Sequence, residues 1–319
     1  MIGLADVRAA AAAIGDGIVR TPLVRAEALD DIAGAPVYLK LELLQHTGSF
    51  KLRGALNRMR GLTAEERERG VITVSAGNHA AGVARAGAAV GTDVLVMMAR
   101  AASPPKVAAT RGYGATVDLE SANAKEAFAR MEAIAAETGR VVIHPFNDPV
   151  VVAGAGTVGL EIATDLPDAD LVIAPVAGGG LIAGIATALR ELAPAARLIG
   201  VQPIATATLP ASLAAGRPET TTMRPTIADA LTAPTTGAVP LEILRDRLAD
   251  VVVLDEDELA TGFRLAYARG RVACEVAGSA PIGALAAGRV DTAGARNVVC
   301  IVSGGNIDPA LAARLLSSK

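Results

Sequence analysis

The sequence is poor in aromatic residues and in cysteine. Aromatic side chains make up 2% of its 319 residues, and tryptophan is absent. Its two cysteines, Cys274 and Cys300, are too few for the disulfide framework on which small secreted domains depend. Cys300 lies in an apolar run and is expected to be a small core residue.

Long apolar runs and basic clusters are also missing. No run approaches the roughly 18 apolar residues that a membrane span needs. The net charge is −3, and no group of Lys and Arg alternates with aromatic side chains, which argues against nucleic acid as a partner. The alanine-rich start carries Asp6 and Arg8, so it predicts an amphipathic helix rather than a signal peptide. We therefore expect a soluble, cytoplasmic, globular protein.

Short β-branched runs alternate with longer segments of helical period along the chain, which is 51% hydrophobic. Apolar strands separated by helices predict an α/β fold built on parallel sheet. The strands are expected at 37–43, 71–75, 93–99, 116–119, 141–144, 171–176, 198–202, 251–254 and 297–302. Helices are expected at 80–89, 122–137, 181–192 and 256–269, the last capped by Asp255 with Glu258. The stretch 217–240 is expected to be an ordered surface excursion. Patterning alone locates no domain boundary.

Lys51 is the most informative residue, at the centre of Gly-Ser-Phe-Lys-Leu-Arg-Gly. It follows a strand-like stretch and opens a predicted helix, where backbone is closely packed and donors are plentiful. Such a lysine can have its pKa lowered and attack an aldehyde as an amine. The heptapeptide by itself fits a solvated helix lysine equally well.

Two further motifs stand between a strand and a helix. Ser75-Ala76-Gly77-Asn78-His79 would offer a carboxylate the free N–H groups of a helix N-terminus, although an ordinary N-cap explains it too. In Ala177-Gly178-Gly179-Gly180-Leu181, consecutive glycines predict a loop that wraps a phosphate, and no Walker-type lysine follows. Ser303, in Ser-Gly-Gly-Asn, ends an apolar strand and would face the ligand crevice.

The stretch Gly154-Ala-Gly-Thr-Val-Gly159 spells the G-x-G-x-x-G dinucleotide fingerprint. The fingerprint needs a full preceding strand, and only a short Val-Val-Val-Ala precedes it here. We interpret these glycines as close packing inside a helix. A nicotinamide oxidoreductase stays open as an alternative of a different class.

Taken together, the motifs resemble the fold-type II pyridoxal-phosphate (PLP) enzymes, in the threonine/serine dehydratase and serine racemase branch. The resemblance runs from Arg20-Thr21-Pro22-Leu23 to Ser303-Gly-Gly-Asn306, and includes His144-Pro-Phe146, Gly156-Thr157 with Glu161, and Thr226-Ile-Ala-Asp229. It implies a two-domain α/β fold of mostly parallel sheets flanked by helices. Residues 1–69 and 148–319 would form the large PLP-binding domain and 70–147 a small mobile domain. Family members are usually homodimers or homotetramers.

The resemblance also implies roles for single residues. Lys51 would form the Schiff base with PLP and then remove the Cα proton. The cofactor would further contact Phe50, Asn78, Gly178, Gly179, Gly180, Leu181, Glu275 and Ser303. The amino-acid substrate would lie against Ser75, Ala76, Gly77, Asn78, His79 and Phe146, with Ser75 joining Lys51 among the catalytic residues.

The implied reaction is β-elimination, in which a β-hydroxy amino acid such as L-threonine or L-serine gives a 2-keto acid and ammonia. A neutral Ser303 at the pyridine nitrogen makes the ring a moderate electron sink, which favours expulsion of the β-hydroxyl. Other substrates stay open: 3-hydroxyaspartate, phenylserine or a hydroxyectoine-derived amino acid. An idle PLP- or amino-acid-binding protein is a further alternative.

The sequence departs from family patterns at several positions. Ala76 stands where racemases carry a second base, a serine, which disfavours racemisation. Gln202-Pro203 replaces the Glu-Pro of metal-activated members, and Thr206 and Thr208 offer no carboxylate, so we expect no metal. Glu275 is followed by valine rather than the usual proline. The chain ends soon after Ser303, so feedback control by an appended regulatory domain is not expected.

Overall fold

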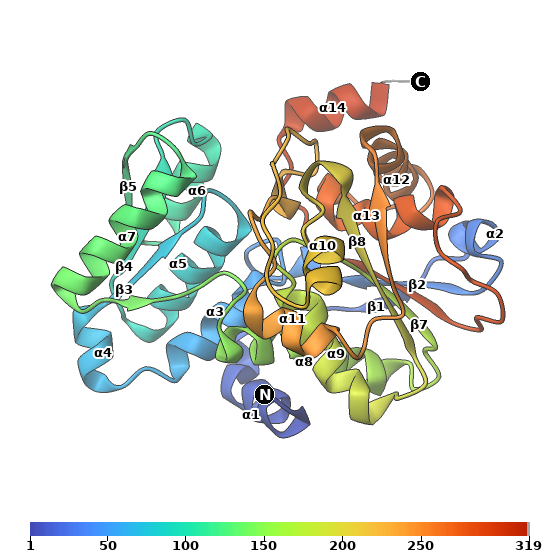
Figure 1. Cartoon of the computed structure of the whole chain (residues 1–319), viewed down its shortest axis with the longest axis horizontal. Coiled ribbons are helices and arrows are strands. Elements are labelled where there is room, and N and C mark those ends of the chain that lie inside the picture. The colour runs from blue at the N-terminus through green and yellow to red at the C-terminus, as the bar shows by residue number, and fades with distance from the viewer. Residues whose placement is uncertain (318–319) are drawn as a thin grey trace.

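The computed structural model describes residues 1–317, which fold around two sheets (Figure 1). The six-stranded sheet has the order β1-β2-β10-β7-β8-β9, and the four-stranded sheet the order β5-β4-β3-β6. Strand β1 pairs with β2 antiparallel, and the other strand pairs of residues 1–317 are parallel. The predicted α/β class with mostly parallel sheets is confirmed. The strands are β1 Leu23–Arg25, β2 Val37–Leu41, β3 Val71–Val74, β4 Val94–Ala99, β5 Thr116–Ser121, β6 Val141–Val142, β7 Leu171–Pro175, β8 Arg197–Pro203, β9 Asp250–Leu254 and β10 Val298–Val302.

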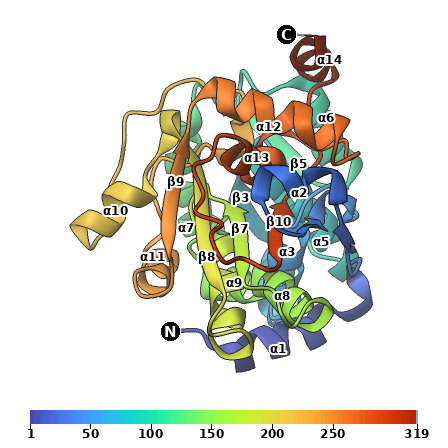
Figure 2. The ribbon, with the colours of Figure 1, turned by 90° about the vertical axis from the view of Figure 1, so that its right-hand side faces the viewer.

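Helices cover both faces of each sheet. On the six-stranded sheet, α12 and α13 pack on one face, and α8 and α9 on the other (Figure 2). On the four-stranded sheet, α3 and α5 pack on one face and α7 on the other. The helices are α1 Leu4–Ile14, α2 Asp30–Ala33, α3 Lys51–Arg60, α4 Ala64–Arg69, α5 Asn78–Val90, α6 Pro104–Gly112, α7 Ala124–Thr138, α8 Pro149–Asp165, α9 Gly180–Leu192, α10 Leu209–Ala215, α11 Ala238–Leu244, α12 Glu256–Ala268, α13 Val276–Ala286 and α14 Pro309–Ser317.

Continuous apolar runs form the central strands because both of their faces are buried. Every residue of β7 and of β10 is buried, including Cys300, as the sequence predicts. One expected strand was twice as long as the observed one, and one short strand was not predicted. The run 141–144 forms strand only at its first two residues, and His144 lies in the turn that follows. The three-residue β1 was not predicted, because so short a run carries no period.

The glycines of the G-x-G-x-x-G stretch lie inside α8, where they allow two neighbouring helices to approach. A Cβ on Gly154 would lie 2.7 Å from the carbonyl oxygen of Arg53 on α3, and one on Gly156 would lie 2.9 Å from that of Gly184 on α9. The interpretation of close packing inside a helix is confirmed. A dinucleotide site would need these glycines in a loop that follows a strand, and here they lie inside a helix.

Smaller predictions about the helices also hold. The N-terminal segment forms the helix α1, which buries Leu4, Val7, Ala10 and Ile14 along one side. Asp255 and Glu258 form the predicted capping box of α12. Across residues 1–317, no helix is both long enough and apolar enough to cross a membrane.

Candidate active site

The sequence motifs meet where strands of both sheets end. They follow the carboxyl ends of β2, β3, β6, β7 and β10, the edge at which α/β proteins bind their ligands. Two loops are joined directly, since Ser49 and Gly304 form a β-bridge and the Phe50 N–H donates to the Ser303 carbonyl at 3.1 Å. The residues predicted from β2 and β10 are therefore neighbours.

Lys51 is the first residue of α3, and its side chain is half-buried. The Nζ atom donates to the carbonyl oxygen of Pro145 at 2.9 Å and lies 5.1 Å from the ring centre of Phe50. Burial lowers the pKa of Lys51 from 10.5 to about 8, and the nearby carboxyl of Glu275 offsets part of that shift. At pH 7 about a tenth of such a lysine is the free amine, which is the nucleophilic form.

The glycine loop connects β7 to α9. Gly179 has φ +95°, a left-handed conformation that favours glycine, and a Cβ there would lie 2.8 Å from Pro240. A Cβ on Gly178 would overlap the ring of Phe146. The N–H groups of Gly180 and Leu181 belong to the first turn of α9, so they have no partner within the helix. Phe146, which adjoins Pro145, thus links the Lys51 side of the site to this loop.

Two serine hydroxyl groups near Lys51 form no hydrogen bond with the described part of the protein. Ser303 directly follows β10 and is 5% exposed as a residue, and no hydrogen bond joins its hydroxyl to residues 1–317. Ser49 Oγ is fully buried and is likewise unpaired among the described residues. Because buried polar groups are nearly always hydrogen-bonded in native proteins, such atoms indicate room for a polar ligand.

Asn78 joins the four-stranded sheet to the six-stranded sheet across the site. Its Nδ2 donates to Glu275 Oε1 at 2.7 Å, and its Oδ1 accepts from Asn306 Nδ2 at 2.7 Å. Asn306 Nδ2 also donates to the carbonyl oxygen of Thr47 at 2.8 Å. Burial raises the pKa of Glu275 to about 8, and the bond from Asn78 opposes that shift. Burial thus favours the protonated form of Glu275, and Asn78 favours the carboxylate.

The residues in and after the loop between β3 and α5 differ in burial and in hydrogen bonding. Ser75 Oγ accepts from the Gly77 N–H at 3.1 Å, and Ala76 is exposed. The imidazole of His79 is buried, with Nε2 3.0 Å from the Ile143 carbonyl oxygen, and burial lowers its pKa to about 3. The ring of His79 is neutral and points into the core. What His79 can offer a carboxylate is its backbone N–H in the first turn of α5.

The geometry therefore combines a buried lysine, a glycine loop at a helix N-terminus and an unpaired serine hydroxyl. A family model described as pyridoxal-phosphate dependent enzyme matches residues 14–304. The chain belongs to the pyridoxal-phosphate-dependent enzymes. The resemblance stated from the motifs is thereby confirmed.

Relatives of this PLP-dependent enzyme share most of its length. It is 39% identical over 317 residues to an L-threonine ammonia-lyase of Thermotoga maritima, covering 99% of this chain and 79% of that protein. Maize serine racemase superposes with a TM-score of 0.93 at 32% identity, covering 98% of this chain and 96% of that one. The processed form of threonine deaminase isoform 2 from Solanum lycopersicum gives a TM-score of 0.92 at 34% identity, covering 99% and 92%.

The residues present fit PLP. The glycine loop leaves no space for side chains, and the N–H groups of Gly180 and Leu181 have no partner within α9, so they can serve a phosphate. Lys51 can supply its amine to the aldehyde, and the unpaired hydroxyl of Ser303 can bond the ring nitrogen. We propose that Phe50, Phe146 and Asn78 complete the cofactor's surroundings, although Asn78 already bonds Glu275 and Asn306 in this structure.

Gln202 occupies the place where a metal was considered from the sequence. Its Nε2 donates to the Ala177 carbonyl oxygen at 3.2 Å, and its Oε1 accepts from the Leu209 N–H at 2.9 Å. Thr208 bonds the hydroxyl of Thr236 at 3.1 Å. Among residues 1–317, no group of three or more His, Cys, Asp and Glu side chains lies close enough to hold a metal ion.

Sequence reasoning missed three contributors to the site. Asn306 was quoted within a motif but given no role, and it anchors Asn78. The Pro145 carbonyl oxygen holds Lys51, and a backbone acceptor leaves no signal in side-chain chemistry. His144 Nδ1 accepts from the Asn147 N–H at 2.9 Å, which fixes the ring as its Nε2–H form.

Proposed function

We propose that this PLP-dependent enzyme is an ammonia-lyase that dehydrates and deaminates a β-hydroxy amino acid, with L-threonine as the first candidate and L-serine next. The observation that supports this most strongly is that Lys51, the glycine loop and Ser303 lie together at the strand ends, where the uncharged Ser303 would meet the ring nitrogen. Similarity to L-threonine ammonia-lyases along nearly the whole chain supports the same reaction. The product would be a 2-keto acid with ammonia.

In the proposed reaction, different residues remove the Cα proton and hold the substrate carboxylate. The chemistry that PLP supplies when bound is withdrawal of electrons from the bonds at Cα of the substrate. The free amine of Lys51 takes the proton from Cα, since its lowered pKa makes it a base near neutral pH. The first turn of α5, with Ser75, Gly77 and Asn78, holds the carboxylate by N–H and hydroxyl groups.

The geometry favours elimination over other outcomes. Ser303 carries no charge, so it does not stabilise negative charge on the ring as a carboxylate partner would. Departure of the β-hydroxyl then relieves the charge at Cα, and the leaving oxygen takes up one proton, equal to the one removed from Cα, to become water. Phe146, packed on the glycine loop, walls the pocket and helps to exclude water from the reacting carbon.

The test is release of 2-keto acid by the purified protein with added PLP. The panel is L-threonine, L-serine, D-serine, threo-3-hydroxyaspartate and phenylserine. We expect L-threonine to give 2-ketobutyrate and ammonia in equal amounts. Lack of keto acid from every member, with the cofactor's visible absorption present, would contradict the proposed substrates.

Racemisation is the second candidate, because maize serine racemase is among the close structural neighbours. Ala76 argues against it, since its methyl group cannot act as a base on the second face of the substrate. We predict that Ala76→Ser introduces detectable formation of D-allothreonine from L-threonine, or of D-serine from L-serine, while keto acid release stays within about threefold of the unchanged enzyme. Chiral chromatography checks this. Equal product stereochemistry in both proteins would show that a serine here is insufficient.

We further propose that residues 70–147 move as a small domain that closes over the site, and that the protein is a homodimer or homotetramer. Closure is supported by the bonds from Asn78 to Glu275 and Asn306, which cross between the two sheets. Scattering of the protein with and without a competitive amino acid tests the movement. Sedimentation measures the oligomer.

A further inference from the structure

A cluster of four charged side chains lies buried behind Lys51. Lys40, Glu42, Arg53 and Glu161 are here called the ion cluster; the first three side chains are 0% exposed and that of Glu161 is 11% exposed. Two positive and two negative charges make the ion cluster neutral. Arg53 and Glu161 come from motifs that carry the family resemblance, and none of the four side chains is bonded to the glycine loop or to Ser303.

Arg53 is the centre of the ion cluster. Its Nε and Nη2 donate to the two carboxylate oxygens of Glu42 at 2.8 Å each. Its Nη1 and Nη2 donate to the oxygens of Glu161 at 2.6 and 2.9 Å, and Nη1 also reaches Thr157 Oγ1 at 3.1 Å. Lys40 Nζ lies 2.5 Å from Glu161 Oε2. Such two-sided, paired contacts fix the guanidinium plane in a way that a lysine could not.

The ion cluster ties together the elements around the start of α3. Lys40 is on β2, Glu42 follows that strand, and Glu161 is on α8. Arg53 is the third residue of α3 and Lys51 the first, so their side chains leave the helix about 200° apart. Arg53 therefore points into the large core, while Lys51 points into the site. Fixing Arg53 fixes the turn that carries the Lys51 amine.

Stability alone does not account for such a cluster. Removing charges from water offsets much of what their attraction contributes, and apolar side chains of similar volume often serve as well. Helix α3 is also held on α8 by close glycine packing and by Asn57, whose Nδ2 donates to the Val150 carbonyl oxygen at 2.8 Å. Packing already holds α3 against α8, and the ion cluster in addition fixes the orientation of α3.

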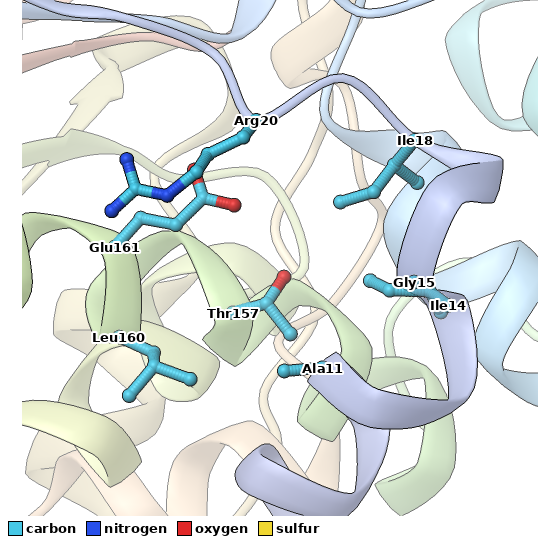
Figure 3. Close-up of a pocket in the computed structure, with 8 residues that line it drawn as sticks. All are labelled: Ala11, Ile14, Gly15, Ile18, Arg20, Thr157, Leu160 and Glu161. Atoms are coloured by element: carbon cyan, nitrogen blue, oxygen red, sulfur yellow. The ribbon is translucent and has the colours of Figure 1, made fainter.

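One edge of the ion cluster approaches water. A cavity of about 190 Å³ lies between α1 and α8, with Glu161 and Thr157 on one wall and Ile14 and Ile18 on the other (Figure 3). Arg20 at its rim pairs with Asp165 rather than with Glu161. The cavity thus ends on the least buried member of the ion cluster, and changes at Glu161 are the easiest for the fold to absorb.

We propose that Arg53 is a positioning residue: held by Glu42 and Glu161, it sets the first turn of α3 so that the Lys51 amine meets the cofactor aldehyde and the substrate Cα. This inference rests on the proposed function for its catalytic part, and only on family membership for its cofactor part. It assigns the four buried charged residues to one task behind the active site.

The first test compares Arg53→Met and Arg53→Lys with the unchanged holoenzyme. We expect Arg53→Met to bind PLP at least about tenfold more weakly and to lower kcat about 100-fold with KM changed less. Arg53→Lys keeps the charge without the paired contacts, so it should lie between the two. The pH at which the visible absorption of the bound cofactor changes should also move in both variants.

A matched control separates positioning from general loss of stability. Asn57→Ala loses a bond between the same two helices, so it should lower the melting temperature while PLP affinity and the absorption pH profile stay unchanged. If Arg53→Met behaves like Asn57→Ala, with a lower melting temperature and normal PLP affinity and kcat, the proposal is wrong.

A second variant covers the case in which Arg53→Met does not fold. Lys40→Met combined with Glu161→Gln removes one opposite pair and leaves Arg53 bonded to Glu42. Weaker PLP binding and lower kcat support the proposal, and normal values for both in a folded protein overturn it. Failure of the function is separate: an enzyme inactive on the whole substrate panel, whose PLP affinity still responds to Arg53, contradicts the function alone.

Discussion

Lys51 shows how far single residues can be interpreted from the sequence. Its neighbours Ser49, Phe50 and Gly48 predicted a close-packed site for an amine, and burial with a pKa of about 8 agrees with that prediction. The same sequence could not reveal that the Pro145 carbonyl oxygen, 94 positions away, holds the amine in place. Backbone acceptors have no residue-type signature, so they are found only in the fold.

Replacing this lysine tests the central assignment. Lys51→Ala should lower keto acid release about 1,000-fold or more, because both the covalent attachment and the base are lost. It should also remove the visible absorption of attached PLP. Lys125→Ala is the control, since Lys125 is exposed on α7, and it should keep full activity and absorption. Turnover by Lys51→Ala close to normal would remove Lys51 from the mechanism.

His79 makes a prediction about pH. Burial lowers its pKa to about 3, well below the 6.5 of the unfolded chain. Between pH 6.5 and pH 3, His79 binds a proton in the unfolded chain but not in the folded protein. The contribution of His79 to the free energy of unfolding is therefore complete above pH 6.5 and declines as the pH falls. The free energy of unfolding should therefore drop by up to about 1.4 kcal/mol per pH unit below 6.5. His144, whose pKa burial lowers to about 4, adds a similar slope.

Urea unfolding of the protein between pH 5 and 7 measures this slope. His79→Gln should reduce the slope by the contribution of one proton. An unchanged slope in His79→Gln would mean that the imidazole is not held neutral.

The glycine loop carries the clearest prediction at the scale of elements. Gly179→Ala should weaken PLP binding at least about tenfold, because Gly179 has φ +95° and its new methyl group would press on Pro240. Gly216→Ala is a matched control. Gly216 is also left-handed, with φ +67°, and its Cβ would meet no described atom within 4 Å. Both changes should cost about 1–2 kcal/mol of stability.

Only Gly179→Ala should change the cofactor affinity, as measured by titration of the apo protein. Equal PLP affinity in the two variants would place the phosphate elsewhere. The triple glycine was itself predictable, since three adjacent glycines exceed what a turn requires. The contact between the glycine loop and Phe146 was not predictable from the sequence. Phe146 follows β6 and the loop follows β7, so the contact depends on how the two sheets are placed relative to each other.

The same limit holds for other elements. Apolar runs located the long buried strands β7 and β10 to within one or two residues. The run 141–144 was predicted too long because His144 uses its ring to bond two backbone N–H groups of the turn, at 3.2 and 2.9 Å. Side chains that bond the local backbone end a strand earlier than apolar character suggests.

At the scale of the whole molecule, the chain is predicted to work without a divalent metal. Gln202 stands where metal-activated members carry a glutamate, and its amide bonds the Ala177 carbonyl oxygen before the glycine loop and the Leu209 N–H at the start of α10. Adding Mg²⁺ or a chelator should change kcat by less than about twofold. Keto acid release measured with and without each is sufficient. Activation of several-fold by the metal would contradict this reading of Gln202.

The order of strands is the part of the fold that the sequence could not give. The last strand in the chain, β10, lies in the middle of the six-stranded sheet, between β2 and β7. Its apolar residues match either neighbour equally well, because a fully buried strand has no polar face to set its partner. The two-domain division therefore came from the resemblance rather than from patterning.

The central position of β10 has a consequence for the protein as it leaves the ribosome. Until residues 298–302 emerge, β1-β2 and β7-β8-β9 are two separate ribbons with facing unpaired edges. The segment that carries Lys51 follows β2 in one ribbon, and the glycine loop follows β7 in the other. Ser303 follows the missing strand β10. A nascent chain halted before residue 298 should thus expose two unpaired strand edges and capture no cofactor, so β10 must be synthesised before PLP can bind.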